Sequence, residues 1–279
     1  MKIDSPRQLK DWINNKAKEN NLIANTVLQN FMMERLLERI SVSKYKDNFI
    51  LKGGFLIAAM IGIDMRSTMD MDTTIKGVPV NRDAIEVILN EILSIDLEDN
   101  VNFKLENIKN IHDISDYDDF RVSVEAQFFT IRVKMKIDIT TGDVIIPREV
   151  EYSFKLMFEE RYISIKAYNL NTILAEKVES ILVRNVANTR ARDFYDVYIL
   201  LSLRRKDINI ESLRSAIITK AEERNTLVYI ENNEKYLRDI EVSEDLKAIW
   251  ESYTRKYPYA KGIQFSEITN ILREIFKEI

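Results

Sequence analysis

The stretch FILKGGFLIAAMIGIDMRSTMDMDTTI, residues 49–75, holds the only adjacent glycines of the chain, Gly53 and Gly54, and an Asp-x-Asp further on. An apolar run precedes the glycines, and a second one follows them and ends at Gly62. This order predicts a short buried strand, a turn, and a helix that ends at a capping glycine. The turn leaves backbone N–H groups at the start of a helix, where a phosphate is favoured; alternatively, the glycines only permit a sharp corner.

The Asp-x-Asp lies in MDMDTTI, whose alternation is typical of a strand. Alternation places Asp70 and Asp72 on one face, and it places Met69 and Met71 on the other face, where we expect both to pack inward. Adjacent carboxylates repel each other and aspartate is disfavoured in strands, so the pattern indicates a compensating cation. A solvated edge strand is the alternative interpretation.

A third carboxylate, Asp138, lies near the end of the later strand pattern RVKMKIDIT. The apolar residues of that stretch alternate with it, so Asp138 is expected on the opposite face, together with Lys134 and Lys136. Two carboxylates on one strand and a third on a neighbour are the ligands that a two-metal phosphoryl-transfer site needs. An aspartate at a strand end before a turn explains Asp138 equally well.

The composition narrows the possible chemistry. The 279 residues contain no cysteine, and His112 is the only histidine, which argues against zinc fingers, disulfide scaffolds and histidine-activated nucleophiles. Any metal chemistry must then use carboxylates, which favour Mg2+ or Mn2+. The formal net charge of -4 argues against a general nucleic-acid coat, although clusters such as RNVANTRAR can meet phosphate locally. The chain shows neither a signal-peptide pattern nor a long apolar run, so we expect a cytoplasmic protein.

Helical signals dominate both ends of the chain, and strand signals dominate the middle. A capping pattern at Ser5, repeated at Thr26, predicts a helical lead-in of roughly 45 residues. Between residues 49 and 166, stretches such as VNFKLENI, RVSVEAQFF, IRVKMKIDI and RYISIKAY alternate as strands do, with one helix, NRDAIEVILNEIL, among them. The remainder repeats apolar residues at helical spacing. We therefore expect an α+β fold with an N-terminal domain, residues 1–168, and a C-terminal helical domain, residues 169–279.

Four motifs follow one another along the chain: LKGG, RSTMDMD, ILAEKVESILVR and RARDFYDVYIL. In this order they resemble the AbiEii/AbiGii toxin family, the nucleotidyltransferase-like toxins of abortive-infection toxin–antitoxin systems, within the DNA polymerase beta superfamily. The resemblance runs from about Lys52 to Leu201. It implies a nucleotidyltransferase-like mixed sheet as the core of the N-terminal domain.

The last two motifs can also be interpreted by their spacing. Lys177 and Arg184 share one polar stripe of a helix and could point at the same anion. Asp193 and Asp196 lie three residues apart on the next helix, and ordinary surface pairing with Lys177 and Arg192 is the alternative. The resemblance implies instead that Lys177 contacts a nucleoside triphosphate and that Asp193 is the catalytic acid of the motif, with Asp196 as its rival.

The resemblance also implies a metal-dependent nucleotidyltransferase. Asp70 and Asp72 would be the catalytic ligands of two magnesium ions, and Asp138 would complete the metal site. Gly53 and Gly54 would cradle phosphate.

Three more residues are implied as nucleotide contacts: Lys52, Arg66 and Thr68. Many relatives carry a small hydroxyl residue after the glycines, whereas this chain has Phe55, so backbone amides and Lys52 or Thr68 would have to compensate. Relatives suggest GTP or a pyrimidine triphosphate as the donor, a tRNA 3′ end as the acceptor and an antitoxin encoded nearby as the partner. A metal-dependent nuclease and a non-catalytic nucleotide-binding module are the alternatives.

Arginine is concentrated around the last motif. Five arginines fall within 22 residues: Arg184, Arg190, Arg192, Arg204 and Arg205. Because such side chains bind backbone phosphates, we expect an RNA acceptor to approach over the helical domain.

Overall fold

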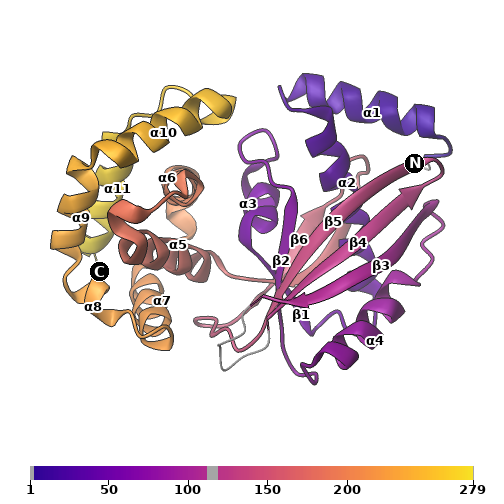
Figure 1. Cartoon of the computed structure of the whole chain (residues 1–279), viewed down its shortest axis with the longest axis horizontal. Coiled ribbons are helices and arrows are strands. Elements are labelled where there is room, and N and C mark those ends of the chain that lie inside the picture. Colours follow the sequence, from indigo (N-terminus) through magenta and orange to yellow (C-terminus); the bar gives the residue numbers. More distant parts are fainter. Residues whose placement is uncertain (1–2, 112–118, 279) are drawn as a thin grey trace. The chain divides into compact units, whose positions relative to one another are not determined.

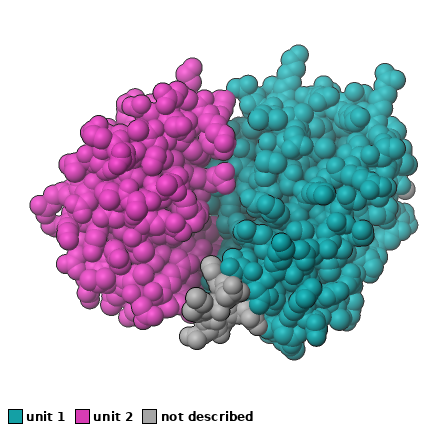
Figure 2. All heavy atoms as spheres, in the orientation of Figure 1, with its two compact units in different colours: residues 1–143, 150–167 teal, residues 144–149, 168–279 magenta. Residues whose placement is uncertain are grey.

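The computed structural model describes residues 3–111 and 119–278, so His112 lies outside the described residues. The described chain forms two compact units, residues 1–143 with 150–167 and residues 144–149 with 168–279 (Figure 2). Within the described residues, none of the helices combines the length and the hydropathy of a transmembrane span.

The first unit is built on a mixed sheet that has seven strands within the described residues, in the order β3-β4-β5-β2-β1-β7-β6 (Figure 1). The pairs β2–β5 and β1–β7 are parallel, and the other neighbours are antiparallel. The strands are β1 (Phe49–Lys52), β2 (Asp70–Ile75), β3 (Val101–Asn110), β4 (Phe120–Phe128), β5 (Ile131–Thr140), β6 (Val150–Lys155) and β7 (Tyr162–Ala167). This sheet and the helices around it confirm the expected α+β fold.

One face of the sheet is apolar and the other is polar. On β4 and β5 every second side chain is apolar and buried, as Val122, Val124 and Met135 show. Helices α2 (Ala24–Val42) and α4 (Arg82–Leu93) pack on the sheet, α2 against β5 and β7 and α4 against β3. Burial of the apolar side chains under helices leaves the alternate, polar side chains of β4 and β5 on the opposite face.

The two N-terminal helices begin differently. Helix α1 (Pro6–Glu19) follows Ser5, whose hydroxyl accepts a hydrogen bond from the backbone N–H of Gln8, as the capping pattern predicted. Helix α2 begins two residues before Thr26, and its N-cap residue, Ile23, makes no side-chain hydrogen bond. The predicted helix start at Thr26 is therefore wrong, because this residue already lies in the first turn.

Strand β1 continues into helix α3 (Gly53–Ile61) without a loop between them. The helix ends at Gly62, where φ is +102° and the N–H donates to the carbonyl of Ala58 at 2.9 Å. The strand–glycine–helix order expected from the sequence is present. Strand β6 was not indicated by the sequence, because it is an edge strand in which Phe154 alone is buried and its alternation is weak.

The second unit is helical. Its central helix, α5, contacts α6, α7, α8 and α9, and its predicted apolar stripe from Leu174 to Leu182 is buried. Residues 144–149 join this unit through hydrogen bonds from the Asn169 side chain to two of their carbonyls. Its helices are α5 (Leu170–Arg184), α6 (Ala191–Arg204), α7 (Ile210–Glu223), α8 (Leu227–Glu231), α9 (Asn233–Val242), α10 (Glu244–Lys256) and α11 (Phe265–Glu278).

Candidate active site

Charged residues of four neighbouring strands form a row across the polar face of the sheet. The strand registers place Lys52 of β1 opposite Asp72 of β2, and Asp72 opposite Asp138 of β5. Asp138 in turn lies opposite Arg121 of β4. Asp70 precedes Asp72 by two residues on β2 and therefore shares its face, where Asp70 is exposed and Asp72 is partly buried. The sheet thus sets two adjacent acids between two basic residues, and we refer to Lys52, Asp72, Asp138 and Arg121 as the charged row.

Gly53 and Gly54 lie directly beside the charged row. Gly53 has a φ of +67°, and a Cβ on it would come within 2.0 Å of Oδ2 of Asp72. A Cβ on Gly54 would lie 3.0 Å from Nη2 of Arg66 and 3.0 Å from Oγ1 of Thr68. The backbone can therefore approach the carboxylate this closely only with glycine at position 53. The junction brings the predicted residues of the first two motifs together.

Two side chains of α2 fix the segment between α3 and β2. Nδ2 of Asn30 donates to the carbonyl of Thr68 at 2.8 Å, and Nε2 of Gln29 donates to the carbonyl of Met69 at 3.0 Å. Gln29 also donates to the carbonyl of Lys134 at 3.2 Å, which ties the segment to β5. Both amide side chains are buried. They set the position of the strand that carries Asp70 and Asp72, and sequence reasoning missed them.

Met69 does not lie where the alternation of MDMDTTI predicts. It precedes the first residue of β2 and is 42% exposed, whereas Met71 is fully buried. The prediction that both methionines pack inward is therefore wrong for Met69, because the pleated strand begins only at Asp70. Arg66 and Thr68 are the buried residues of this segment.

Lys52 is anchored by an acid that the sequence did not single out. Its Nζ lies 2.6 Å from Oδ2 of Asp143, which also accepts a hydrogen bond from Oγ1 of Thr140 at 2.5 Å. The side chains of Lys52 and Asp143 are largely buried. Asp143 follows a Thr-Gly pair that indicates only a turn, so nothing in the sequence alone joins it to Lys52.

Asp138 is held by a bidentate ion pair. Nε and Nη2 of Arg121 lie 2.8 Å and 2.7 Å from the two carboxylate oxygens of Asp138. The hydrogen bond to Asp138 and its charge, with smaller contributions from the charges of Asp70 and Asp72, raise the pKa of the Arg121 guanidinium. Arg121 was also missed, because its place opposite Asp138 follows from strand register.

The acids of this face are suitable ligands for a hard cation. Asp70 and Asp72 supply carboxylate oxygens on one face of one strand, which is the donor type that Mg2+ and Mn2+ prefer. Both oxygens of Asp138 are engaged by Arg121, which leaves fewer of their lone pairs for a metal. Over the residues described, no group of three or more Asp, Glu, His or Cys side chains is already arranged around one metal position.

In the second unit, the residues of the last two motifs form a buried ionic cluster. Nζ of Lys177 lies 2.6 Å from Oδ1 of Asp193 and 3.0 Å from Oδ2 of Asp196. Both aspartates are fully buried, and Lys177 is 13% exposed at its side chain. Arg190 adds a second cation, with Nε 2.9 Å from Oδ2 of Asp193. The pairing considered from the sequence is present for Lys177, but it lies in the interior rather than at the surface, and Arg192 is hydrogen-bonded to Tyr257 instead. We refer to Lys177, Asp193 and Asp196 as the Lys177 cluster.

A family model described as "Nucleotidyl transferase AbiEii toxin, Type IV TA system" matches residues 35–270. The chain belongs to the AbiEii toxin family. The resemblance stated from the four motifs is thereby confirmed, and all of them lie within the matched residues.

Solved structures share the fold at low sequence identity. A Helicobacter pylori protein described as a "putative nucleotidyltransferase" aligns over 92% of this chain and 96% of its own, with 16% identity and a TM-score of 0.52. JHP933 from Helicobacter pylori aligns over 88% of this chain and 89% of its own, with 14% identity and a TM-score of 0.48. The first of these shows a nucleotidyltransferase-like fold for this AbiEii family member. A comparison with curated protein sequences gave no match.

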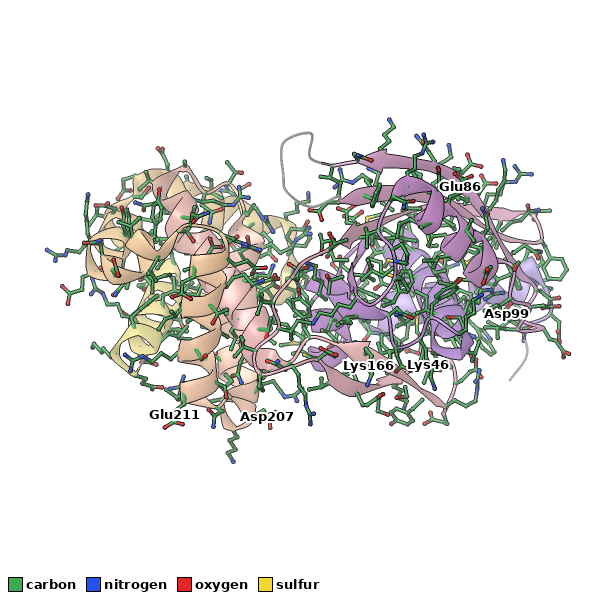
Figure 3. The ribbon with its side chains drawn as sticks, turned by 90° about the horizontal axis from the view of Figure 1, so that it is seen from below. Lys46, Glu86, Asp99, Lys166, Asp207 and Glu211 are labelled. Atoms are coloured by element: carbon green, nitrogen blue, oxygen red, sulfur yellow. The ribbon has the colours of Figure 1, made fainter. Side chains whose placement is uncertain are left out.

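The arginines near the last AbiEii motif do not form a single free patch. Arg204 lies 2.5 Å from Oδ2 of Asp207, and Arg205 pairs with Glu278. Figure 3 shows Asp207 and Glu211 together at the surface of the second unit, so acidic side chains accompany this part of the arginine-rich stretch. The expected approach of an RNA over this domain remains a prediction.

Proposed function

We propose that this protein is a metal-dependent nucleotidyltransferase toxin that transfers a nucleotide from a nucleoside triphosphate to the 3′ end of a tRNA. GTP or a pyrimidine triphosphate is the donor, and the toxin acts in a toxin–antitoxin pair that aborts phage infection. The observation that carries the proposal is the charged row beside the Gly53–Gly54 junction. Membership of the AbiEii family supports it.

The adjacent carboxylates account for the metal requirement. Asp70 and Asp72 would hold Mg2+ or Mn2+, with Asp138 as a third ligand. Magnesium bound there would lower the pKa of the attacking hydroxyl and neutralise charge on the triphosphate.

The residues around the acids would bind the triphosphate. Gly53 and Gly54 would offer backbone N–H groups at the start of α3, where anions are favoured. Phe55 is buried and packs on Phe154 with ring centroids 5.5 Å apart, so it contributes to the core instead of contacting phosphate. Lys52 would supply positive charge to the phosphates, since its ammonium is already held beside the junction by Asp143.

Three further residues are proposed as nucleotide contacts. Arg66 and Thr68, which line Gly54, would shape the phosphate turn from the first unit. The family resemblance also assigns the triphosphate to Lys177, whose ammonium is held by Asp193. The protein partner implied by the family is a cognate antitoxin.

A labelling experiment tests the proposed function. The full chain is incubated with Mg2+, total RNA and each α-labelled nucleoside triphosphate in turn, and the products are separated by size. We expect a labelled band of tRNA size and release of pyrophosphate, both abolished by EDTA. Shortened RNA without label would indicate a nuclease, and label on protein would refute the RNA acceptor. Triphosphate binding without any transfer would indicate a non-catalytic binding module.

A further inference from the structure

One pocket of the second unit combines cations with tyrosine rings. It has a volume of about 430 Å³ and lies between the start of α6 and the end of α10. Its charged lining residues are Arg190, Arg192 and Lys256, and its aromatic ones are Tyr253 and Tyr257. None of its lining residues is acidic, although the whole chain carries a net charge of -4. The pocket is therefore suited to an anion that also has a flat ring.

Tyr257 provides a fixed ring at this pocket. Its centroid lies 4.6 Å from that of Tyr253 and 5.4 Å from that of Tyr259, and the latter ring is inclined to it by only 26°. The hydroxyls of Tyr253 and Tyr259 are hydrogen-bonded to each other at 3.1 Å, which braces both neighbours. A ring held in this way loses little conformational entropy when a base stacks on it.

The cations lie around the same ring. Nζ of Lys256 is 5.4 Å from the centroid of the Tyr257 ring, and Arg192 is hydrogen-bonded to the Tyr257 hydroxyl. Burial raises the pKa of Tyr257, but the hydrogen bond and charge of Arg192 and the charge of Lys256 lower it overall. Arg192 is partly exposed and Lys256 is exposed, so both can reach a ligand from solvent.

Arg190 connects the pocket to the Lys177 cluster. It lines the pocket, and its guanidinium pairs with Asp193, which holds the ammonium of Lys177. Two ion pairs, Arg190–Asp193 and Asp193–Lys177, therefore connect the lining of the pocket to Lys177, the residue proposed to contact the triphosphate.

We propose that this pocket binds one nucleotide of a single-stranded RNA, with its base stacked on Tyr257 and its phosphate contacted by Arg192 and Lys256. The identification of the RNA as the acceptor rests on the proposed function. A phosphodiester carries one negative charge, which two cations satisfy, and every base offers a face for stacking on tyrosine. A free nucleoside triphosphate also carries a base, but its phosphates hold several more negative charges than these two cations neutralise.

The test measures RNA binding by the full chain without any nucleoside triphosphate. Fluorescence anisotropy of a labelled single-stranded RNA oligonucleotide is recorded for the native protein and for three variants: Tyr257→Leu, Tyr257→Phe and Arg192→Gln/Lys256→Gln. Arg238→Gln is the charge control, because Arg238 lies in the same unit, on α9, is exposed, and is absent from the pocket lining.

We expect Tyr257→Leu to weaken RNA binding roughly tenfold, since one stacked base contributes about 1–3 kcal/mol. The double charge variant should bind more weakly than the native protein and lower the slope of log affinity against log salt by about 0.7, the value for one lost phosphate contact on a single strand. Tyr257→Phe keeps the ring and should bind within about twofold of the native protein, as should Arg238→Gln.

Three results would overturn the pocket: native-like binding by both Tyr257→Leu and the double charge variant, no RNA binding by the native protein, or GTP binding that depends on Tyr257. The double variant alters surface side chains, so it decides the matter even if Tyr257→Leu does not fold. Nucleotide transfer is measured separately. If the native protein binds RNA in a Tyr257-dependent way but transfers no nucleotide, the proposed function is refuted and the proposed RNA pocket is retained.

Discussion

The charged row of the first unit and the Lys177 cluster of the second use the same residue types in opposite ways. In the first unit, Asp70 and Asp72 reach an open sheet face as neighbouring like charges. In the second, Asp193 and Asp196 are fully buried and share the ammonium of Lys177. The acids of the first unit lie on a polar sheet face where Asp70 is exposed, whereas the acids of the second unit are enclosed around one ammonium.

This difference separates two kinds of mutational effect. Removing a carboxylate from an open face changes local charge and ligand number with little loss of buried contact. Removing one member of a buried ion pair leaves a desolvated charge behind, which is strongly destabilising. Loss of activity therefore reports chemistry in the first unit, but it mixes chemistry with stability in the second.

The largest effect is expected at the open acids. Asp70→Asn and Asp72→Asn remove a negative ligand without changing volume, so nucleotide transfer and toxicity should fall by orders of magnitude. Transfer assays and growth arrest measure this, with circular dichroism to confirm the fold. Glu86→Gln, which neutralises an exposed acid on α4, is the control and should keep full activity. A folded Asp70→Asn variant that still arrests growth at equal expression would remove Asp70 from the metal site.

The next effect concerns the Lys177 cluster. Lys177→Ala leaves two buried aspartates without their shared cation, so the free energy of unfolding should fall by about 3–5 kcal/mol. Lys177→Arg should restore stability only in part, because its planar guanidinium has a different geometry. Urea denaturation measures both.

A triple variant separates stability from chemistry at Lys177. Lys177→Ala/Asp193→Asn/Asp196→Asn removes the buried charges together and should recover most of the stability lost in Lys177→Ala. If this stable variant is inactive, the cluster contributes to transfer. Full activity would instead make the cluster an element of the fold alone.

A buried acid outside both sites gives a smaller, pH-dependent effect. Burial raises the pKa of Glu34 to about 7, against the opposing charge of Arg35 and a hydrogen bond from the backbone of Met157. The pKa of Glu34 is higher in the folded than in the unfolded state, so its contribution to the free energy of unfolding is complete below pH ~4.5. This contribution, about 3 kcal/mol, is lost as the pH rises to ~7. Glu34→Gln should remove this dependence from the free energy of unfolding.

An exposed acid serves as the control for Glu34. Hydrogen bonds from Lys44 and Tyr45 lower the pKa of Glu91, so its contribution changes with pH in the opposite direction. Glu91→Gln should therefore leave the loss of stability between pH 4.5 and 7 in place. If Glu34→Gln retains that loss as well, the titrating group is another one.

In both units, the sequence predicted the features that depend on the local period of the side chains. Alternation was sufficient to place Asp70 and Asp72 on one face, because a strand fixes side-chain direction by period alone. It failed at Met69, where the strand had not yet begun. Helical spacing likewise predicted the buried stripe of α5, because a helix also fixes side-chain direction by its period.

What the sequence did not predict depends on contacts between distant segments. Arg121 faces Asp138 through strand register, Asp143 reaches Lys52 from 91 residues away, and Gln29 contacts a carbonyl 40 residues along the chain. No local pattern encodes such pairs. The burial of Asp193 likewise depends on how α5 and α6 pack, which their separate stripes do not specify.

The smallest effect is expected at the end of the charged row. There, the ion pair between Arg121 and Asp138 affects whether Asp138 can bind a metal together with Asp70 and Asp72. Arg121→Gln frees both oxygens of Asp138. A partly exposed pair of this kind contributes about 0.2–1 kcal/mol, so Mn2+ should bind roughly 1.4- to 5-fold more tightly in isothermal titration. Arg132→Gln is the matched control, because it removes the same charge from a pair with Glu125 at the other end of β5.

A second variant tests whether the increase in Mn2+ affinity depends on Asp138. Such a test is needed because removing the positive charge of Arg121 favours Mn2+ binding anywhere on this face. Arg121→Gln/Asp138→Asn keeps the loss of the arginine but removes the carboxylate ligand. If Asp138 joins the metal, the double variant should bind Mn2+ no more tightly than the native protein. If the double variant keeps the full gain, the effect is one of charge at a distance, and Asp138 serves only to hold Arg121 beside Asp70 and Asp72.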